Sequence, residues 1–219
     1  IAHLKDDFEV AYSHRRRTAP FDIPNVKSVY LDLEDDDSIA TTLHETLPDV
    51  VVNCAGAWGD VVATTAGVEP VGLQPMRRTA FMVDGPGLDT TGWAFVGDID
   101  LDWYLRDDGP QMLCSLAEEN PSDPCDPKPE EVDVALAIER LNEATTLDIR
   151  SVNSAWVGLR TFAPDRSMVI GPDPNQPTFV WCVGQGGTGI QTAPGAGQLT
   201  AELAVGVGLS PAFGGLVLD

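Results

Sequence analysis

The sequence predicts an α/β fold that combines an incomplete open parallel sheet with an antiparallel sheet. Residues 49–53 form a short continuous apolar run after a helical pattern, as strands buried on both faces of a parallel sheet do. Between residues 61 and 155, apolar and polar residues alternate in short segments separated by turns, which is typical of antiparallel strands. Two kinds of sheet are therefore expected in one chain.

The start of the chain is expected to contribute two strands, a helix and a third strand. Residues 8–12 alternate like a strand, and residues 26–33 form the second one. Aspartate and serine side chains at residues 35–38 can cap a helix that runs to about Leu47, because they accept hydrogen bonds from its free N–H groups. With the strand at residues 49–53, this order predicts an open parallel sheet that lacks its first strand.

The middle of the chain favours short strands around one amphipathic helix. The first strands are expected at residues 73–83, 93–96, 103–106 and 111–116. After a loop rich in proline and acidic residues, a helix is expected at about residues 132–145, with Val134, Ile138 and Leu141 on its apolar side. Further strands are expected at residues 156–162, 168–170 and 177–183. The last of these strands leads into a glycine loop.

The glycine loop at residues 184–189 is the most informative part of the sequence. It precedes a helix that is expected to begin near Ile190 and to run to about Val207. Glycine lets the backbone approach a ligand closely, and free N–H groups at a helix start favour an anionic group. The spacing Gly184-x-Gly186-x-x-Gly189 matches a dinucleotide fingerprint, but no further strand follows, so the loop is expected to close a cofactor site that opens elsewhere. The alternative is a turn that only packs the last helix onto a sheet.

These patterns divide the chain into three segments. Residues 1–60 are expected to form a partial dinucleotide-binding, Rossmann-like sheet, and residues 61–155 an antiparallel-sheet domain that binds the substrate. Residues 156–219 are expected to return to the cofactor-binding domain, with the glycine loop and the last helix.

The composition of the chain excludes several classes of partner and site. The 219 residues include 34 acidic and 13 basic side chains, so the formal net charge is −21. This charge repels nucleic acids and anionic membranes, and it fits a protein from a high-salt cytoplasm. No apolar run is long enough to span a membrane and no signal peptide is visible, so a cytoplasmic location is expected. The four cysteines are widely spaced and the three histidines all precede residue 45, so neither a metal site nor a disulfide framework is indicated.

Five motifs between about residue 50 and the C-terminus follow one another in a fixed order. They occupy residues 51–58, 72–78, 156–160, 164–165 with 170–171, and 185–191. In this order they resemble the D-amino-acid oxidase superfamily of flavoproteins, and most closely FAD-dependent D-amino-acid dehydrogenases of the D-arginine dehydrogenase type. The resemblance implies FAD as the cofactor, a small amino-acid substrate, and hydride transfer from a D-amino acid or related amine to flavin N5.

The resemblance also implies roles for individual residues. Arg78 and Arg160 would hold the substrate carboxylate, Tyr104 would hydrogen-bond it, and the carbonyl of Gly187 would orient the amine. Two segments would contact the flavin, namely Ala55, Gly56, Ala57 and Trp58, and Gly186, Gly187, Thr188, Gly189, Ile190 and Gln191. Structural alternatives stay open, since arginines in so acidic a chain pair with surface acids and Tyr104 can pack within a sheet.

The start of the chain departs from the flavoprotein pattern. It lacks the early Gly-x-Gly-x-x-Gly motif that binds the FAD pyrophosphate. Through residues 13–17, 30–33 and 49–55, residues 1–55 instead resemble extended short-chain reductases of nucleotide sugars, such as dTDP-4-dehydrorhamnose reductase. Because the first residue is also Ile1 rather than methionine, we expect a truncated or hybrid chain.

Two alternatives to a flavin oxidoreductase remain at this point. An NAD(P)-dependent nucleotide-sugar reductase needs a tyrosine with a lysine four residues later, but Arg16, Glu34 and Asp108 occupy that position after the three tyrosines. The other alternative is an inactive acidic fragment.

Overall fold

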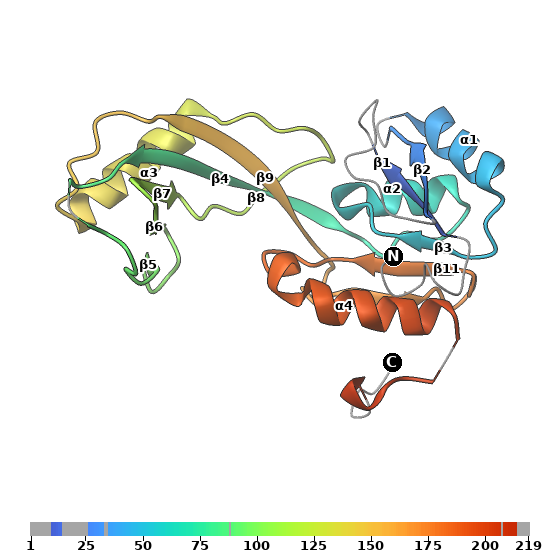
Figure 1. The fold of residues 1–219 in the computed structure, drawn as a ribbon. Coiled ribbons are helices and arrows are strands. Elements are labelled where there is room, and N and C mark those ends of the chain that lie inside the picture. Colours follow the sequence, from blue (N-terminus) through green and yellow to red (C-terminus); the bar gives the residue numbers. More distant parts are fainter. Residues whose placement is uncertain (1–9, 15–25, 33–34, 88, 207, 214–219) are drawn as a thin grey trace. The chain divides into compact units, whose positions relative to one another are not determined.

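The chain divides into two compact units. The computed structural model describes residues 10–14, 26–32, 35–87, 89–206 and 208–213 (Figure 1). Unit 1 contains Ile1–Gln74 and Thr161–Asp219, and unit 2 contains Pro75–Arg160. The sequence patterns set these boundaries at residues 60 and 155. In the structure the change from one unit to the other falls within β4 (Gln74–Asp84) and β9 (Ser154–Phe162), which pair with each other.

Unit 1 contains two small open sheets. In the first, β1 (Val10–His14) pairs in parallel with β2 (Val26–Tyr30). In the second, β11 (Phe179–Val183) lies between β3 (Val51–Asn53), which is parallel to it, and β10 (Val169–Pro172), which is antiparallel. The order of the elements in the sequence predicted that β3 joins the first two strands, but among the described residues β3 pairs with β11, because both are short apolar strands that need a buried neighbour.

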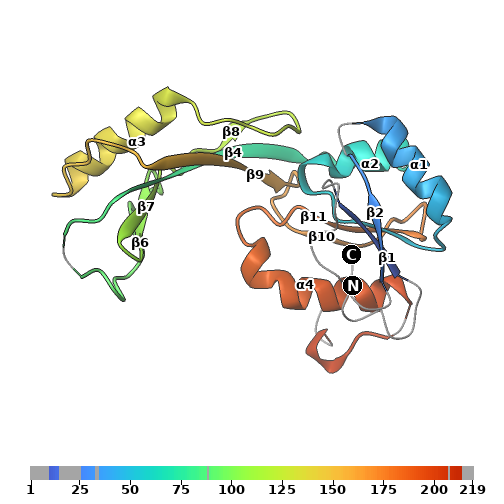
Figure 2. The same cartoon turned by 45° about the horizontal axis from the view of Figure 1, so that its top comes forward.

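The helices of unit 1 pack on the second sheet and on each other. They are α1 (Asp36–Thr46), η1 (Gly56–Trp58), α2 (Gly59–Thr65), α4 (Gly189–Ala204) and η2 (Pro211–Phe213). The predicted cap of α1 is present, since Asp35 Oδ1 accepts the N–H groups of Asp37 at 3.1 Å and Ser38 at 3.4 Å. α4 lies along β10 and β11, as both ribbon views show (Figures 1 and 2). The sequence did not indicate α2, a helix of 7 residues with no side-chain cap.

Asp173 is buried next to the core of unit 1 and is only 5% exposed. Its Oδ2 accepts a hydrogen bond from Trp181 Nε1 at 3.2 Å, and its Oδ1 accepts the N–H groups of Asn175 at 2.9 Å and Gln176 at 3.0 Å. Burial raises the pKa of Asp173, but the three hydrogen bonds outweigh burial and hold this pKa below its ordinary value. The ionised carboxylate therefore joins β11 to the turn that precedes it.

Unit 2 is built on an antiparallel sheet with the strand order β5-β6-β7-β4-β8, and β9 also pairs with β4. Besides β4 and β9, this sheet contains β5 (Val96–Gly97), β6 (Tyr104–Asp108), β7 (Gln111–Ser115) and β8 (Asn120–Pro121). Ala80 of β4 lies opposite Ser115 of β7, and Tyr104 of β6 lies opposite the same residue. Open parallel and antiparallel sheets in one chain confirm the predicted α/β fold class.

The core of unit 2 lies between this sheet and α3 (Glu131–Ala144). Leu141 and Ala137 are fully buried on the inner side of the helix, with Val134 and Ile138 half-buried beside them, as the helical spacing predicted. The opposite side of the helix faces solvent, and its Val132 is 67% exposed. The sheet contributes the largest buried side chains, Phe81 and Met112.

We expect Asp173→Asn to lower the free energy of unfolding by about 1–3 kcal/mol at neutral pH, because one of its three donors then faces an NH₂ group. A depressed pKa means that Asp173 stabilises the fold above the ordinary aspartate pKa of about 3.9, and that this contribution is lost as the pH falls through the folded-state pKa. Urea unfolding should therefore show the difference from wild type shrinking in acid. Asp165→Asn is the control, since this exposed carboxylate contacts only the Ser167 N–H, and an equal loss there would contradict the expectation.

We expect Leu141→Ala to lower the free energy of unfolding of unit 2 by about 2–5 kcal/mol, because it removes a fully buried side chain and leaves a cavity. Val132→Ala, on the exposed side of the same helix, should change it by less than about 0.5 kcal/mol. Urea unfolding followed by circular dichroism measures both. Similar losses for the two variants would mean that α3 does not pack on the sheet as described.

Candidate functional site

The three side chains predicted to bind the substrate lie on the face of the unit 2 sheet that is opposite α3. They are Arg78, Tyr104 and Arg160. Side chains alternate between faces along a strand, and Phe81 marks the α3 side of β4, so Arg78 points to the other side. Leu105 and Ala155 mark the α3 side of β6 and β9 in the same way. Tyr104 is an odd number of residues from Leu105, and Arg160 is an odd number of residues from Ala155. Both side chains therefore point to the same face of the sheet as Arg78.

Arg78 is held by the segment that follows β7. Its Nε donates a hydrogen bond to the carbonyl of Glu118 at 2.8 Å, and its Nη2 lies 3.4 Å from Glu119 Oε1. Glu118 Oε1 accepts the N–H of Thr79, whereas Glu118 Oε2 is buried without a hydrogen-bond partner among the described residues. Ala117 adopts a left-handed φ of 60°, which turns the chain at this point. The Arg78 guanidinium, with its side chain 11% exposed, is thus fixed in position.

Arg78 and Arg160 are close enough for their charges to interact. Burial lowers the pKa of Arg78 and the positive charge of Arg160 lowers it further, whereas Tyr104 and the two glutamates act in the opposite direction. Arg160 is half-buried, and its guanidinium makes no hydrogen bond or ion pair with another described residue. Two neighbouring cations, one of them without a partner, suit an anion such as a carboxylate.

Tyr104 lies beside this pair and is supported by an aromatic contact. Its ring stacks on Phe95, with 5.1 Å between the ring centroids and an interplanar angle of 29°. Sequence reasoning missed Phe95, and it also missed Glu118 and Glu119. The available signal was an acidic pair directly after an expected strand, but only the pairing of β4 with β7 brings that pair to Arg78.

The first segment predicted to contact the cofactor is the turn after β3, which Asn53 holds in place. The side chain of Asn53 is 2% exposed, donates to the carbonyl of Gly59 at 2.8 Å and accepts the N–H of Ala55 at 3.2 Å. Gly56 has a φ of 57°, and a Cβ built on it would meet nothing within 4 Å. Ala57 packs inward at 7% exposure, so its backbone rather than its side chain is available. The open side of this turn is therefore at Gly56.

The second segment is the glycine loop, in which two glycines are required by the loop itself. Gly184 and Gly186 have φ angles of 74° and 53°, which glycine adopts readily. A Cβ on Gly184 would lie 3.1 Å from the Ser167 carbonyl, and one on Gly186 would overlap the Phe162 ring. The expectation that the glycines leave room for a ligand is therefore wrong for these two, because side chains and backbone of the protein fill that space.

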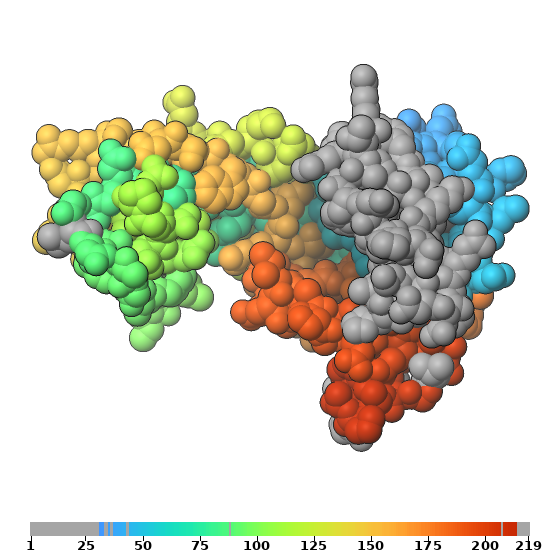
Figure 3. Space-filling view, in the orientation of Figure 1, coloured from blue at the N-terminus to red at the C-terminus, as the bar shows by residue number. Residues whose placement is uncertain are grey.

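The start of α4 is open, unlike the two glycines before it. Thr188 makes no capping hydrogen bond through its side chain, so the first N–H groups of the helix lack acceptors within the helix. Gly187, Thr188 and Gln191 are exposed, and Ile190 is 97% exposed. α4 forms part of the visible surface of unit 1, where it is orange and red in Figure 3. Free donors at the positive end of a helix dipole favour a negatively charged group.

These two segments fit a flavin. They follow the carboxyl ends of β3 and β11, which are neighbouring parallel strands, and dinucleotides bind at this edge of such sheets. Of the predicted cofactor residues, Ala55, Gly56, Trp58, Gly186 and Gly189 are half-buried, and the others apart from Ala57 are exposed. The open space over Gly56 and the uncapped helix start are the observations that carry the fit.

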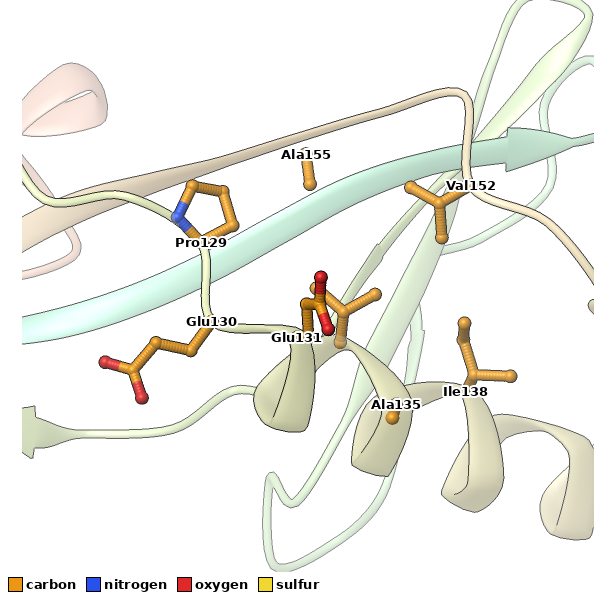
Figure 4. A pocket seen from close by; sticks show the side chains of 8 residues that line it. Pro129, Glu130, Glu131, Ala135, Ile138, Val152 and Ala155 are labelled. Carbon is orange, nitrogen blue, oxygen red and sulfur yellow. The ribbon is translucent and has the colours of Figure 1, made fainter.

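An apolar groove of about 340 Å³ lies beside α3, on the opposite face of the sheet from Arg78 (Figure 4). Val134, Ile138 and Val152 line it, and Glu130 and Glu131 lie at one end. This lining contains no cationic side chain, so the groove does not suit a carboxylate. In the ranges that the structure describes, no cluster of three or more histidine, cysteine or acidic residues suits a metal ion, and no helix combines the length and apolar character needed to cross a membrane.

The chain matches a family of flavin enzymes over most of its length. The model of the DAO family, described as "FAD dependent oxidoreductase", matches residues 26–203. The chain belongs to the DAO family. This membership confirms the predicted FAD-dependent oxidoreductase class and the prediction of FAD as the cofactor. The match also covers most of the segment that resembles short-chain reductases, which favours the DAO family over the reductase alternative.

Two curated proteins resemble part of this chain in sequence. FAD-dependent oxidoreductase domain-containing protein 1 of Mus musculus is 30% identical over 178 residues, which cover 70% of this chain and 35% of that protein. A D-amino-acid oxidase of Streptomyces coelicolor is 31% identical over 174 residues, or 77% of this chain and 51% of the oxidase. The chain thus spans about a third to a half of the curated relatives it matches.

Solved structures of similar fold include two oxidases. Iminodiacetate oxidase from Chelativorans sp. BNC1 aligns with a TM-score of 0.68 at 18% identity, covering 87% of this chain and 53% of the oxidase. Glycine oxidase from Geobacillus kaustophilus aligns with a TM-score of 0.63 at 19% identity, covering 74% of this chain and 42% of the oxidase. At these identities the likeness concerns the fold.

We expect Gly186→Ala to destabilise the chain more than Gly56→Ala, because both residues have a left-handed φ but only the alanine at 186 overlaps Phe162. Gly56→Ala should cost about 1–2 kcal/mol for the backbone alone, and Gly186→Ala about 1–3 kcal/mol more for the overlap. Thermal and urea unfolding of the two variants measure the difference. Equal losses would show that Phe162 does not support the glycine loop.

Proposed function

We propose that this chain contributes to the FAD-dependent oxidation of a D-amino acid or a related amine that carries a carboxylate. One observation carries the proposal: Arg78 and Arg160 lie on one face of the sheet, and the Arg160 guanidinium has no partner among the described residues. A bound carboxylate would neutralise both charges and accept parallel N–H groups from a planar guanidinium. A zwitterionic amino acid supplies such a group.

The remaining side chains of unit 2 would orient this substrate. Because Glu118 and Glu119 already engage Nε and Nη2 of Arg78, its remaining N–H groups would meet the carboxylate together with those of Arg160. Tyr104, held by its stack on Phe95, would donate its hydroxyl to the same carboxylate. Fixing the carboxylate in this way fixes the position of the Cα–H bond that reacts, and such positioning lowers the barrier to the reaction.

The cofactor would be held by unit 1. The open turn at Gly56 and the uncapped start of α4 would contact the flavin, where the N–H groups of Gly189 and Ile190 would stabilise negative charge. FAD, when bound, supplies a two-electron acceptor for the hydride of the substrate. The carbonyl of Gly187 would accept a hydrogen bond from the substrate amine and so keep its lone pair directed for oxidation.

Within the DAO family, we propose an enzyme of the D-arginine dehydrogenase type as the nearest functional class. The ordered motifs at residues 72–78 and 156–160 support this proposal, because they contain both arginines. Relatives named D-amino-acid oxidase, glycine oxidase and iminodiacetate oxidase support a substrate in which an amine lies close to a carboxylate. The strongly acidic composition supports a high-salt cytoplasm as the place of the reaction.

We expect Arg160→Lys to lower kcat/KM for D-amino acids by about 10- to 100-fold, because a lysine cannot make the paired hydrogen bonds of a guanidinium. Most of the change should appear in KM if the carboxylate contact is made equally in the ground and transition states. The assay uses the full-length protein with added FAD, D-arginine or another D-amino acid, and an artificial electron acceptor.

Arg77→Lys is the matched control, since Arg77 lies on the α3 side of β4 and pairs with the Lys128 carbonyl at 2.8 Å and Glu130 at 3.1 Å. Its kinetics should equal those of wild type. Unchanged kinetics in Arg160→Lys would remove Arg160 from the carboxylate site. Protein that takes up no added FAD, judged by the flavin absorption bands, would instead contradict the assignment of the cofactor residues in unit 1.

A further inference from the structure

Two cysteines lie side by side at the ends of the parallel strands β3 and β11. Asn53 of β3 lies opposite Trp181 of β11, and the next residue on each chain is Cys54 and Cys182. Neighbouring strands are about 4.7–4.9 Å apart, which is within the range of about 4.4–6.8 Å that separates the Cα atoms of a disulfide. Cys54 is the first residue after β3, so strand pairing with β11 does not restrain its backbone.

The two side chains point to the same side of the sheet and are in contact. Trp181 and Val183 belong to the core of unit 1, so Cys182 between them faces the other side, toward α4. The two thiols interact closely enough to shift each other's pKa, which is raised at Cys54 and lowered at Cys182, and the Gln185 side chain donates a hydrogen bond to the Cys182 sulfur at 3.5 Å. Cys54 is exposed, so small reagents reach the pair from solvent.

We propose that Cys54 and Cys182 form a redox-active dithiol that a peroxide converts into an intramolecular disulfide and that an added thiol reduces again. The proposal stands on the strand register and the sulfur contact, and it does not depend on the proposed function. Cys182 is the nucleophile because its sulfur accepts a hydrogen bond from the Gln185 side chain, which stabilises a thiolate, and Cys54, the neighbouring thiol, resolves the product.

The chemistry balances with hydrogen peroxide as the oxidant. The Cys182 thiolate attacks one peroxide oxygen, so that an S–O bond forms, the O–O bond breaks and hydroxide leaves, which gives a sulfenic acid. The Cys54 sulfur then attacks the Cys182 sulfur, an S–S bond forms, and the sulfenic oxygen leaves as water with the Cys54 proton. The interaction with Cys54 lowers the pKa of Cys182 and so favours its thiolate, whereas the same interaction raises the pKa of Cys54.

The position of the pair gives the bond a structural effect. Cys54 directly precedes the turn at Ala55 and Gly56, and Cys182 lies two residues before Gly184 at the start of the glycine loop. A disulfide would join the two segments covalently. Exposed disulfides have more oxidising potentials than buried structural ones, and because Cys54 is exposed, this bond should be readily reversed by an added thiol.

The test is to treat the reduced full chain with hydrogen peroxide at neutral pH, block the remaining thiols with N-ethylmaleimide, and map the peptides by mass spectrometry. We expect a Cys54–Cys182 cross-linked peptide that disappears after treatment with dithiothreitol. Cys54→Ser should lose the cross-link and accumulate a sulfenic acid at Cys182, which dimedone traps. Cys182→Ser should lose the cross-link and show little dimedone adduct at Cys54.

Cys125→Ser is the control, because this half-buried thiol lies in unit 2 and contacts Ser122 rather than another cysteine. It should form the cross-link at the wild-type rate. Recovery of Cys54 and Cys182 as free or singly oxidised residues in wild type, while Cys125 is modified, would overturn the proposal. So would cross-links to Cys125 that form as fast as the predicted one. If a serine variant does not fold, judged by circular dichroism, the wild-type peptide map decides the question alone.

Discussion

The repulsion between two guanidinium groups on one sheet face is the constraint on which the candidate site depends. Arg78 and Arg160 lie near each other for two reasons. Their strands, β4 and β9, are paired, and both side chains occupy positions in the strand alternation that point away from α3. In a chain with 34 acidic residues, such cations would be expected to attract carboxylates of the protein. Arg78 is indeed engaged by Glu119, whereas the Arg160 guanidinium has no partner among the described residues. The pairing of β4 with β9 therefore keeps two like charges on one sheet face in a strongly acidic chain, and this is the feature on which the proposed carboxylate site rests.

The sequence predicted the elements more reliably than their partners. The strands at residues 73–83 and 111–116, the helix at 132–145 and the strand before the glycine loop all correspond to observed elements, because their periodicity reflects which side is buried. The pairing of β3 with β11 was not predictable in this way. More than a hundred residues separate the two strands, and local patterns contain no information on such contacts.

At the candidate site, too, the residue types could be predicted from the sequence but the contacts that hold them could not. The residue types at positions 78, 104 and 160 were visible in the sequence, and their roles followed from a family resemblance rather than from spacing. What fixes Arg78 was not visible, because it depends on the left-handed backbone at Ala117 and on a carbonyl of Glu118, and any residue type offers a carbonyl. The glycine loop is a different case, because its pattern was visible in the sequence but one reason for it was not. Gly186 lacks a side chain because the Phe162 ring fills the space that a Cβ would occupy.

The Phe162 ring has two close neighbours, and together they restrict which residue types can occupy position 162. Gly186 approaches the ring closely, and the Arg166 guanidinium carbon lies 3.9 Å from its centroid. A flat aromatic ring is thin enough for the glycine contact and still offers a π face to the cation, whereas a branched aliphatic side chain would offer neither. During evolutionary divergence, position 162 should therefore tolerate exchange among aromatic residues but not drift toward valine or isoleucine, and it should co-vary with the residue at position 186.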